Sequence, residues 1–177
     1  FDRVAAFFTK SQNPDSPVDY GTALGAASTY SVYSYIPRLW ELQGDVYDTG
    51  GNVVLDSREA VLALQRLREA LVCCAPAALR TDWPGQVQSF FNGEVAMVNV
   101  YESHLMDGQR YSDPRIVGKF DVAPMPGIAS IRGGWLLTIS ARTRQADDAA
   151  DFLRWFSSAE NVVSYNMLGG SNPGSAM

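Results

Sequence analysis

The sequence holds few of the side chains from which catalytic sites are built, and its only histidine is His104. A Ser–His–acid hydrolase needs that histidine together with a serine on a strained turn, and no G-x-S-x-G pattern occurs. The H-E-x-x-H pattern of zinc hydrolases, the P-loop and the G-x-G-x-x-G dinucleotide pattern are also missing. We therefore expect His104 to contact ligand or solvent rather than act as a base, and we expect no metal or cofactor.

Paired carboxylates are the remaining catalytic arrangement, because a glycosidase needs only two acids about 5–10 Å apart. The acids at expected turns and element ends are Asp45, Asp48, Asp82, Glu102 and Asp121. Acids in such places commonly cap helices or fix turns, and the sequence places no two of them together. A glycosidase stays an alternative that requires two acids facing each other across a groove.

The two cysteines, Cys73 and Cys74, are adjacent in the chain. Adjacent cysteines cannot close a long loop, and a disulfide between them is a small strained ring. A metal or redox site would call for C-x-x-C spacing with further cysteine or histidine nearby. We expect two small buried residues near the end of a helix.

Aromatic side chains stand out instead, because several lie beside turns or at the expected ends of strands. In chain order they are Tyr30, Tyr33, Tyr35, Trp40, Tyr101 and Trp135. Sugars stack their flat C–H faces on such rings, and a pocket adds a few polar groups. The polar candidates are Asn99, Glu102, Arg132 and Asn172, and Gly133 and Gly134 lack the Cβ atoms that would keep the backbone from a ligand.

The elements that must position these residues follow from hydrophobic periodicity and turn signals. Helices are expected over 1–10, 37–42, 57–72, 86–92, 146–158 and 160–167, and strands over 20–27, 53–55, 94–101, 120–123 and 135–140. The clearest local signal is a capping box in which Asp56 caps the third helix and Glu59 reaches back. Strands separated by helices predict an α/β domain.

Composition narrows the classes of partner. The chain has 177 residues, of which 46% are hydrophobic, so it can bury the core of one domain. Its net charge of -5 disfavours nucleic acid, and no stretch approaches the ~18 apolar residues of a membrane helix. The first residues are typical of the middle of an amphipathic helix, so we expect a fragment of a longer protein with no direct membrane insertion of this segment.

An ordered series of motifs covers nearly the whole chain: NVVLDSREAV (52–61), FFNGEVAM (90–97), FDVAPMPG (120–127), GGWLLTIS (133–140) and AADFLRWF (149–156). Each resembles a segment of the family 1 bacterial extracellular solute-binding proteins. The series resembles the family's "ldspeav" helix start, its "F-x-x-G-x-x-A-M" element, its "P-x-P-G" turn, its "G-G-x-x-x-x-I" strand and the helix that follows.

The resemblance implies a type II periplasmic-binding-protein fold, in which two α/β lobes joined by a hinge close on a ligand. It also implies a non-enzymatic binding component of an ABC importer, which captures a carbohydrate and delivers it to the permease subunits. Such a protein is periplasmic or held at the cell surface, in some cases as a lipoprotein. A polyamine, iron or glycerol-phosphate ligand stays the alternative within the same fold, and acidic clusters or tyrosines with a carboxylate would indicate the first two.

The resemblance also nominates ligand-binding positions. The residue that follows the A-M strand points to Tyr101, flanked by Asn99 and Glu102, and the aromatic segment before a turn points to Tyr33 or Tyr35. The Gly-Gly element nominates Gly133, Gly134 and Trp135, and the terminal loop nominates Asn172.

Family members are much longer than this chain. We therefore expect residues 1–177 to form one α/β lobe, mainly the C-terminal one. Within it, 120–160 is expected to be a crossover segment that normally packs with the N-terminal lobe, which this chain lacks.

Overall fold

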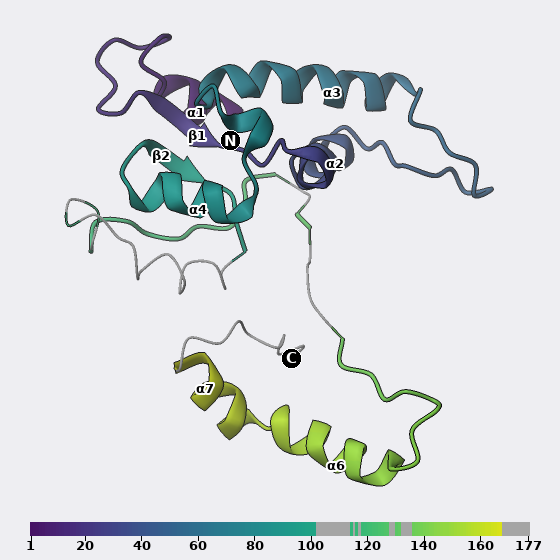
Figure 1. Ribbon diagram of the computed structural model, residues 1–177. Coiled ribbons are helices and arrows are strands. Elements are labelled where there is room, and N and C mark those ends of the chain that lie inside the picture. The colour runs from purple at the N-terminus through teal and green to yellow at the C-terminus, as the bar shows by residue number, and fades with distance from the viewer. Residues whose placement is uncertain (102–113, 115, 117, 128–129, 132–135, 168–177) are drawn as a thin grey trace.

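The computed structural model describes residues 1–101, 114, 116, 118–127, 130–131 and 136–167. Its helices and strands are α1 (Asp2–Phe7), β1 (Tyr20–Ala23), α2 (Ser31–Glu41), α3 (Arg58–Ala70), α4 (Trp83–Phe91), β2 (Val95–Val98), α6 (Ala146–Phe156) and α7 (Ala159–Met167). Short 3₁₀ turns occupy Ser28–Tyr30, Leu71–Cys73 and Ala78–Arg80. Figure 1 shows α1 to α4 gathered around the two strands, with α6 and α7 lying apart from them.

The two strands form a parallel pair in which Tyr20 lies opposite Val95 and Ala23 opposite Val98. Parallel strands need a long crossover connection, and here it runs through α2, α3 and α4. Strands were predicted over 20–27 and 94–101, and the structure confirms both in shorter form. The carboxyl ends of β1 and β2 therefore meet at one edge of the sheet.

Three other strand predictions are wrong. Residues 53–55 contribute a single antiparallel bridge between Tyr47 and Val53, while 120–123 and the described part of 135–140 form no strand. The stretch 136–140 is exposed. A strand is stabilised by ladder hydrogen bonds to a neighbour, and in the described chain no backbone ladder accompanies these segments.

Helix α3 confirms the helix predicted over 57–72, but its cap is one residue later than expected. Ser57 has an extended backbone, and its hydroxyl accepts a 3.2 Å hydrogen bond from the Ala60 N–H. The expectation that Asp56 is the cap is therefore wrong. Both residue types cap helices well, so the choice depended on where the backbone turns rather than on the sequence pattern.

We expect Ser57→Ala to lower the free energy of unfolding by about 1 kcal/mol, because an N–H of the first turn loses its acceptor. Asp56→Ala is the matched control and should change it by less than about 0.5 kcal/mol, as surface substitutions do. Urea unfolding of both variants measures the difference. Equal losses would mean that Asp56 shares the cap.

Two helices begin earlier than the sequence predicted. Helix α2 starts at Ser31 and continues through Pro37, although proline favours the first turn of a helix. Helix α4 starts at Trp83, because the Asp82 side chain accepts a hydrogen bond from the Gly85 N–H at 3.0 Å. Both extensions matter for the site, since they place aromatic residues on first turns.

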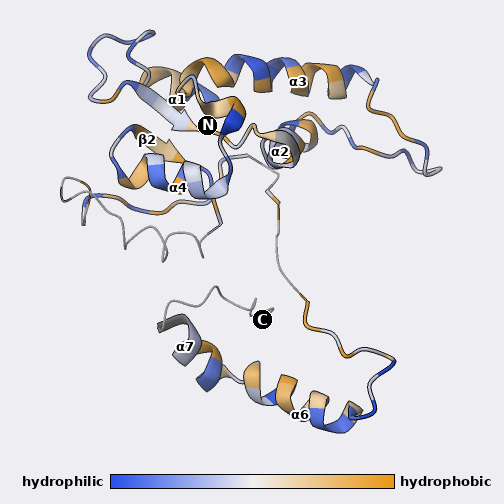
Figure 2. Cartoon of the chain, in the orientation of Figure 1, coloured by the Kyte–Doolittle hydropathy of each residue, from blue (hydrophilic) through white to orange (hydrophobic). Residues whose placement is uncertain are grey.

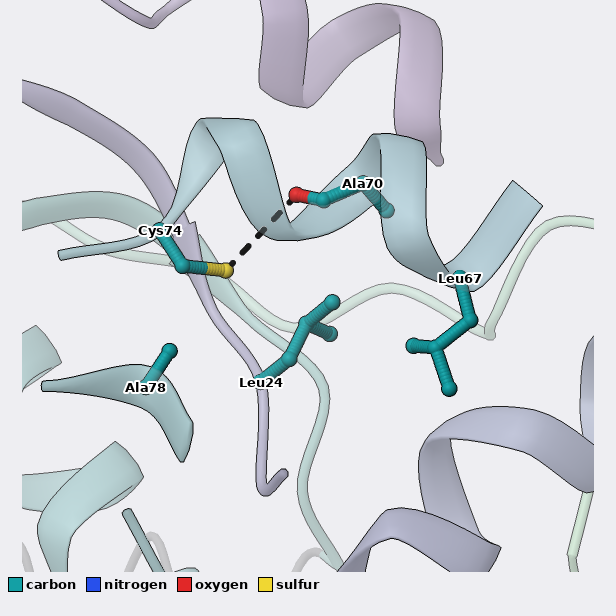
Figure 3. Packing of buried hydrophobic residues seen from close by; sticks show 5 residues of the cluster. All are labelled: Leu24, Leu67, Ala70, Cys74 and Ala78. Carbon is teal, nitrogen blue, oxygen red and sulfur yellow. Dashed lines mark hydrogen bonds between the residues drawn. The ribbon is translucent and has the colours of Figure 1, made fainter. Parts of the chain in front are cut away.

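The core includes two adjoining clusters of buried side chains. One joins Leu24 to Leu67, Ala70, Cys74 and Ala78 (Figure 3). The other joins Leu39 on α2 to Ala60 and Ala63 on α3. Small residues on α3 let α2 approach closely, and Tyr35 packs against both clusters.

Both cysteines are buried and unbridged, which confirms the expected buried position near a helix end. The Cys74 thiol lies against the Ala70 carbonyl (Figure 3), and burial raises its pKa from 9.0 to about 11. The folded protein thus holds this proton more tightly than the unfolded chain does. The resulting stabilisation is fully present below about pH 9 and is lost as the pH rises through 11.

We therefore expect the free energy of unfolding to fall between pH 9 and pH 11, with roughly 1–3 kcal/mol of the loss assigned to Cys74. Urea titrations at several pH values measure it. Cys74→Ala is the comparison, because it keeps all other titrations and should flatten the decline. An unchanged slope in that variant would contradict the assignment.

The α6–α7 pair leaves much apolar surface uncovered. Phe152 and Trp155 are 55% and 59% exposed, and α6 has no buried residue. Figure 2 shows orange stretches along both helices, which among the described residues pack mainly on each other. None of the described helices is both long and apolar enough to cross a bilayer.

The start of the expected crossover segment stays with the rest of the fold. The Phe120 ring contacts Phe90 and Phe91 of α4 edge to face, with centroids 5.7 and 5.3 Å away. Further along, Gly127 lies against the Glu41 carboxylate at the end of α2. Residues 120 to 127 are thus attached to α4 and to the end of α2.

Candidate functional site

Four aromatic rings meet in one group, which we call the aromatic cluster: Tyr30, Tyr33, Trp83 and Tyr101. Trp83 contacts all three tyrosines, with ring centroids 5.3 Å from Tyr30, 4.5 Å from Tyr33 and 5.4 Å from Tyr101. The tyrosine rings stand at 58° to 81° to the indole. Steep arrangements of this kind are favourable for aromatic pairs.

The cluster lies where the two parallel strands end. Tyr30 and Tyr33 belong to the 3₁₀ turn and the first turn of α2 that follow β1, and Tyr101 follows β2. Ligands of open α/β sheets bind outside the carboxyl ends of strands. The fold therefore brings these rings to the edge of the sheet where a ligand site is expected.

All four rings are partly exposed, unlike the core side chains Phe91 and Leu39. Burial raises the pKa of Tyr101, and the neighbouring Tyr33 raises it further. Tyr101 is thus a neutral phenol near pH 7, which can both donate and accept hydrogen bonds. A partly exposed apolar surface with phenol groups suits a hydroxylated ligand.

Two of the predicted ligand-binding residues, Tyr33 and Tyr101, are in the cluster, and two others lie elsewhere. The Tyr35 hydroxyl donates a 3.1 Å hydrogen bond to the Ala60 carbonyl, and burial raises the pKa of this phenol. This phenol points to α3. Trp40 is half-buried near the end of α2.

Of the remaining predicted ligand-site positions, one lies among the described residues and the others do not. Asn99 is half-buried close to Tyr101 in the chain. Outside the described residues lie Glu102, His104, Arg132, Gly133, Gly134, Trp135 and Asn172.

Trp83 is the functional candidate that the sequence reasoning missed. No helix or strand was predicted over 76–84, so the tryptophan there received no role. A signal was present, because Asp82 followed by Pro84 is typical of a helix start with proline in the first turn. Recognising it would have placed Trp83 at the exposed beginning of a helix.

The carboxylates considered for glycosidase chemistry include two with structural partners. Asp48 accepts hydrogen bonds from the Asn52 side chain and from the backbone N–H groups of Asn52 and Gly50, and these lower its pKa. Asp82 caps α4. Among the described residues no three His, Cys, Asp or Glu side chains are grouped so that they could hold a metal ion.

Comparisons with known proteins point in one direction. The sequence profile of the family described as "Bacterial extracellular solute-binding protein" matches residues 10–163. A probable ABC transporter-binding protein of Deinococcus radiodurans is 27% identical over 73% of this chain and 32% of its own length. A probable amino-acid ABC transporter periplasmic-binding protein of Sinorhizobium fredii is 25% identical over 86% of this chain and 36% of its own length.

Solved structures share the fold. An ABC transporter solute-binding protein of Agrobacterium radiobacter in complex with ribitol has a TM-score of 0.75 at 25% identity, covering 97% of this chain and 44% of that one. Maltose-bound MalE3 of T. maritima has a TM-score of 0.78 at 24% identity, covering 98% and 46%. The chain thus spans about a third of the curated relatives' length and less than half of these structures.

Proposed function

Because this chain belongs to the bacterial extracellular solute-binding protein family and has its type II periplasmic-binding-protein fold, we propose that it is part of the substrate-binding component of an ABC importer. We infer that the protein captures a carbohydrate or sugar alcohol, without chemical change, and presents it to permease subunits. Its place is the periplasm or the cell surface, in keeping with an extracellular family.

The observation that carries the ligand class is the aromatic cluster at the carboxyl ends of β1 and β2. Sugars and sugar alcohols combine C–H faces, which pack on rings, with hydroxyl groups, which the tyrosine phenols can bind. Ribitol in one structural neighbour and maltose in another are ligands of these two kinds. Their presence there supports this ligand class.

The polar residues predicted from the sequence complete the proposal. Ring-bound sugars need planar polar side chains for their hydroxyl groups, and Asn99, Glu102, Arg132 and Asn172 are the candidates. Gly133 and Gly134 are proposed to let the backbone approach the ligand, and Trp135 to add a second ring surface. Trp40 stays a candidate on α2, and Tyr35 would act through the position of that helix.

A screen of the full-length protein tests the proposal. We expect saturable thermal stabilisation by a sugar or sugar alcohol, amounting to about 2.7 kcal/mol at a ligand concentration one hundred times Kd. Maltose and ribitol are the first probes, with spermidine and an amino-acid mixture as the competing classes. A response to either competing class but to no carbohydrate would refute the ligand class, and conversion of a bound sugar to product would refute the absence of chemistry.

The second part of the proposal concerns residues 120–160. The uncovered rings of α6 and the separation of α6–α7 from the other helices (Figure 1) support a crossover onto the part of a full-length protein that this chain does not contain. The neighbours match 97–98% of this chain while having more than half of their length outside the match. Amide hydrogen exchange in α6 should be fast in the chain alone and slow in the full-length protein, and equal rates would refute the crossover.

A further inference from the structure

We propose that Trp83 is the specificity-determining residue of this site, the ring on which a neutral, hydroxylated ligand stacks. This inference rests on the proposed function and adds to it a residue at the start of α4. The geometry that points to Trp83 is its central place, since tyrosines from two segments, one after β1 and one after β2, all contact the indole.

The start of α4 holds the backbone that carries this indole. Asp82 closes the first turn by accepting the Gly85 N–H, and one residue earlier the Thr81 carbonyl accepts a 3.3 Å hydrogen bond from the Ala27 N–H. The segment that follows β1 is thereby attached directly to the residue pair that precedes Trp83. A ring carried by a backbone that is held in this way loses little freedom when a ligand binds, which favours affinity.

A second contact lies one helical turn further along. Gln86 is buried, and its side-chain amide approaches Gly25 so closely that a Cβ on Gly25 would lie 2.3 Å from the Gln86 Nε2. The same Cβ would lie 3.4 Å from the Cβ of Tyr30. The absence of a side chain at Gly25 thus lets the segment carrying Tyr30 pack directly on α4.

The spacing of the rings favours a neutral, hydroxylated ligand over an organic cation. A cage for an organic cation needs open space between rings, so that the cation lies within about 6 Å of several ring centroids. Here the centroids of Trp83 and its three neighbours are 4.5 to 5.4 Å apart, which is direct ring contact. The three tyrosines leave no such space beside the indole, so a ligand meets the part of Trp83 that stays exposed, and a flat C–H face fits that part.

The partial exposure of the cluster distinguishes it from a structural core. Phe91 and Leu39, which hold the fold together, are 1% and 0% exposed. Trp83 and its three partners are each only partly covered. Removing the indole should therefore cost ligand affinity more than folding.

Calorimetric titration of the full-length protein with maltose, ribitol and spermidine tests the inference. Trp83→Ala should weaken binding of the sugar or sugar alcohol by tenfold or more, as the loss of a central ring does in well-packed sites, with little change in the thermal midpoint. Trp83→Phe keeps a ring and should retain most of the affinity. Tyr47→Ala removes an exposed ring away from the cluster and should bind as the wild type does.

The outcomes separate the two proposals. Unchanged affinity of Trp83→Ala for a bound carbohydrate would overturn the role of Trp83 and leave the proposed function standing. Tight binding of spermidine that depends on Trp83 would overturn the neutral ligand class. If the wild type binds no carbohydrate, the proposed function fails.

A ligand-free readout keeps the role of Trp83 testable in every case. Without ligand, acrylamide should quench the part of the tryptophan fluorescence that the full-length protein loses in Trp83→Phe. A fully shielded Trp83 in the ligand-free protein would overturn the inference, because no ligand could then stack on it.

Discussion

Gly21→Ala is expected to destabilise the protein by about 3 kcal/mol or more, because the added methyl group overpacks against backbone and displaces buried hydrogen bonds. A Cβ at this position would lie 1.8 Å from the Ala5 carbonyl oxygen, so β1 and α1 would have to separate. That movement strains a chain of contacts in which the Gly21 N–H donates to the Thr9 hydroxyl and the Thr9 hydroxyl donates to the Ala5 carbonyl. Urea unfolding measures the loss.

Gly50→Ala is the matched control for this prediction. At Gly50 the nearest atoms to an added Cβ belong to the flexible side chains of Asn52 and Asp48, at 3.2 Å, in an exposed turn. We expect a change below about 0.5 kcal/mol there. If Gly21→Ala unfolds at the wild-type urea concentration, α1 does not pack on β1 in solution.

Phe91→Ala is expected to cost about 3–5 kcal/mol, the usual range for removing a fully buried phenylalanine. The Phe91 side chain is 1% exposed at the end of α4, and its ring contacts those of Phe90 and Phe120. The variant would leave a cavity beneath the connection that leads away from the fold. Phe7→Ala, which removes a ring that is 62% exposed, is the control and should cost far less.

A double-mutant cycle extends this second prediction to the connection itself. If Phe120 packs on Phe91 in solution, Phe91→Ala and Phe120→Ala should be non-additive by about 0.5–1.5 kcal/mol, the range for aromatic pairs. Additive losses would mean that residue 120 does not stay with α4. The cycle therefore tests where the connection leaves the fold, independently of any ligand.

Local patterns predicted the helices better than they predicted the strands. The apolar residues along one face of α3 and the turn residues at its ends lie close together in the sequence. Patterns of this kind predicted α3 and α6 nearly in full. A strand depends on a partner that is distant in the sequence. The apolar segments at 53–55, 120–123 and 135–140 resemble strands by composition, but the described chain supplies them with no ladder.

The residues of the candidate site were also predicted only in part. Tyr33 and Tyr35 are two residues apart in α2, which corresponds to about 200° around a helix, so they cannot face the same way. The structure places Tyr33 against Trp83 and Tyr35 against α3. Both tyrosines were predicted as candidates, but the direction in which each ring points could not be predicted. That direction depends on where α2 starts and on which face of α2 is covered by α3. Trp83 was missed for a related reason, because the predicted helix began at residue 86 and the first turn of α4 lay outside it.

The parallel pairing of Tyr20 with Val95 also bears on the order in which the protein folds. Helices α2 and α3, which pack on each other, follow one another in the chain. The β1–β2 pair must instead close a long loop, and contacts between such distant residues form slowly. The aromatic cluster depends on that late closure, since Tyr30 and Tyr33, which follow β1, reach Trp83 of α4 only when the two ends of the crossover come together. A chain under folding stress is therefore expected to lose ligand capture while its helices persist, so that binding, rather than helix content, is the sensitive measure of whether this protein has finished folding.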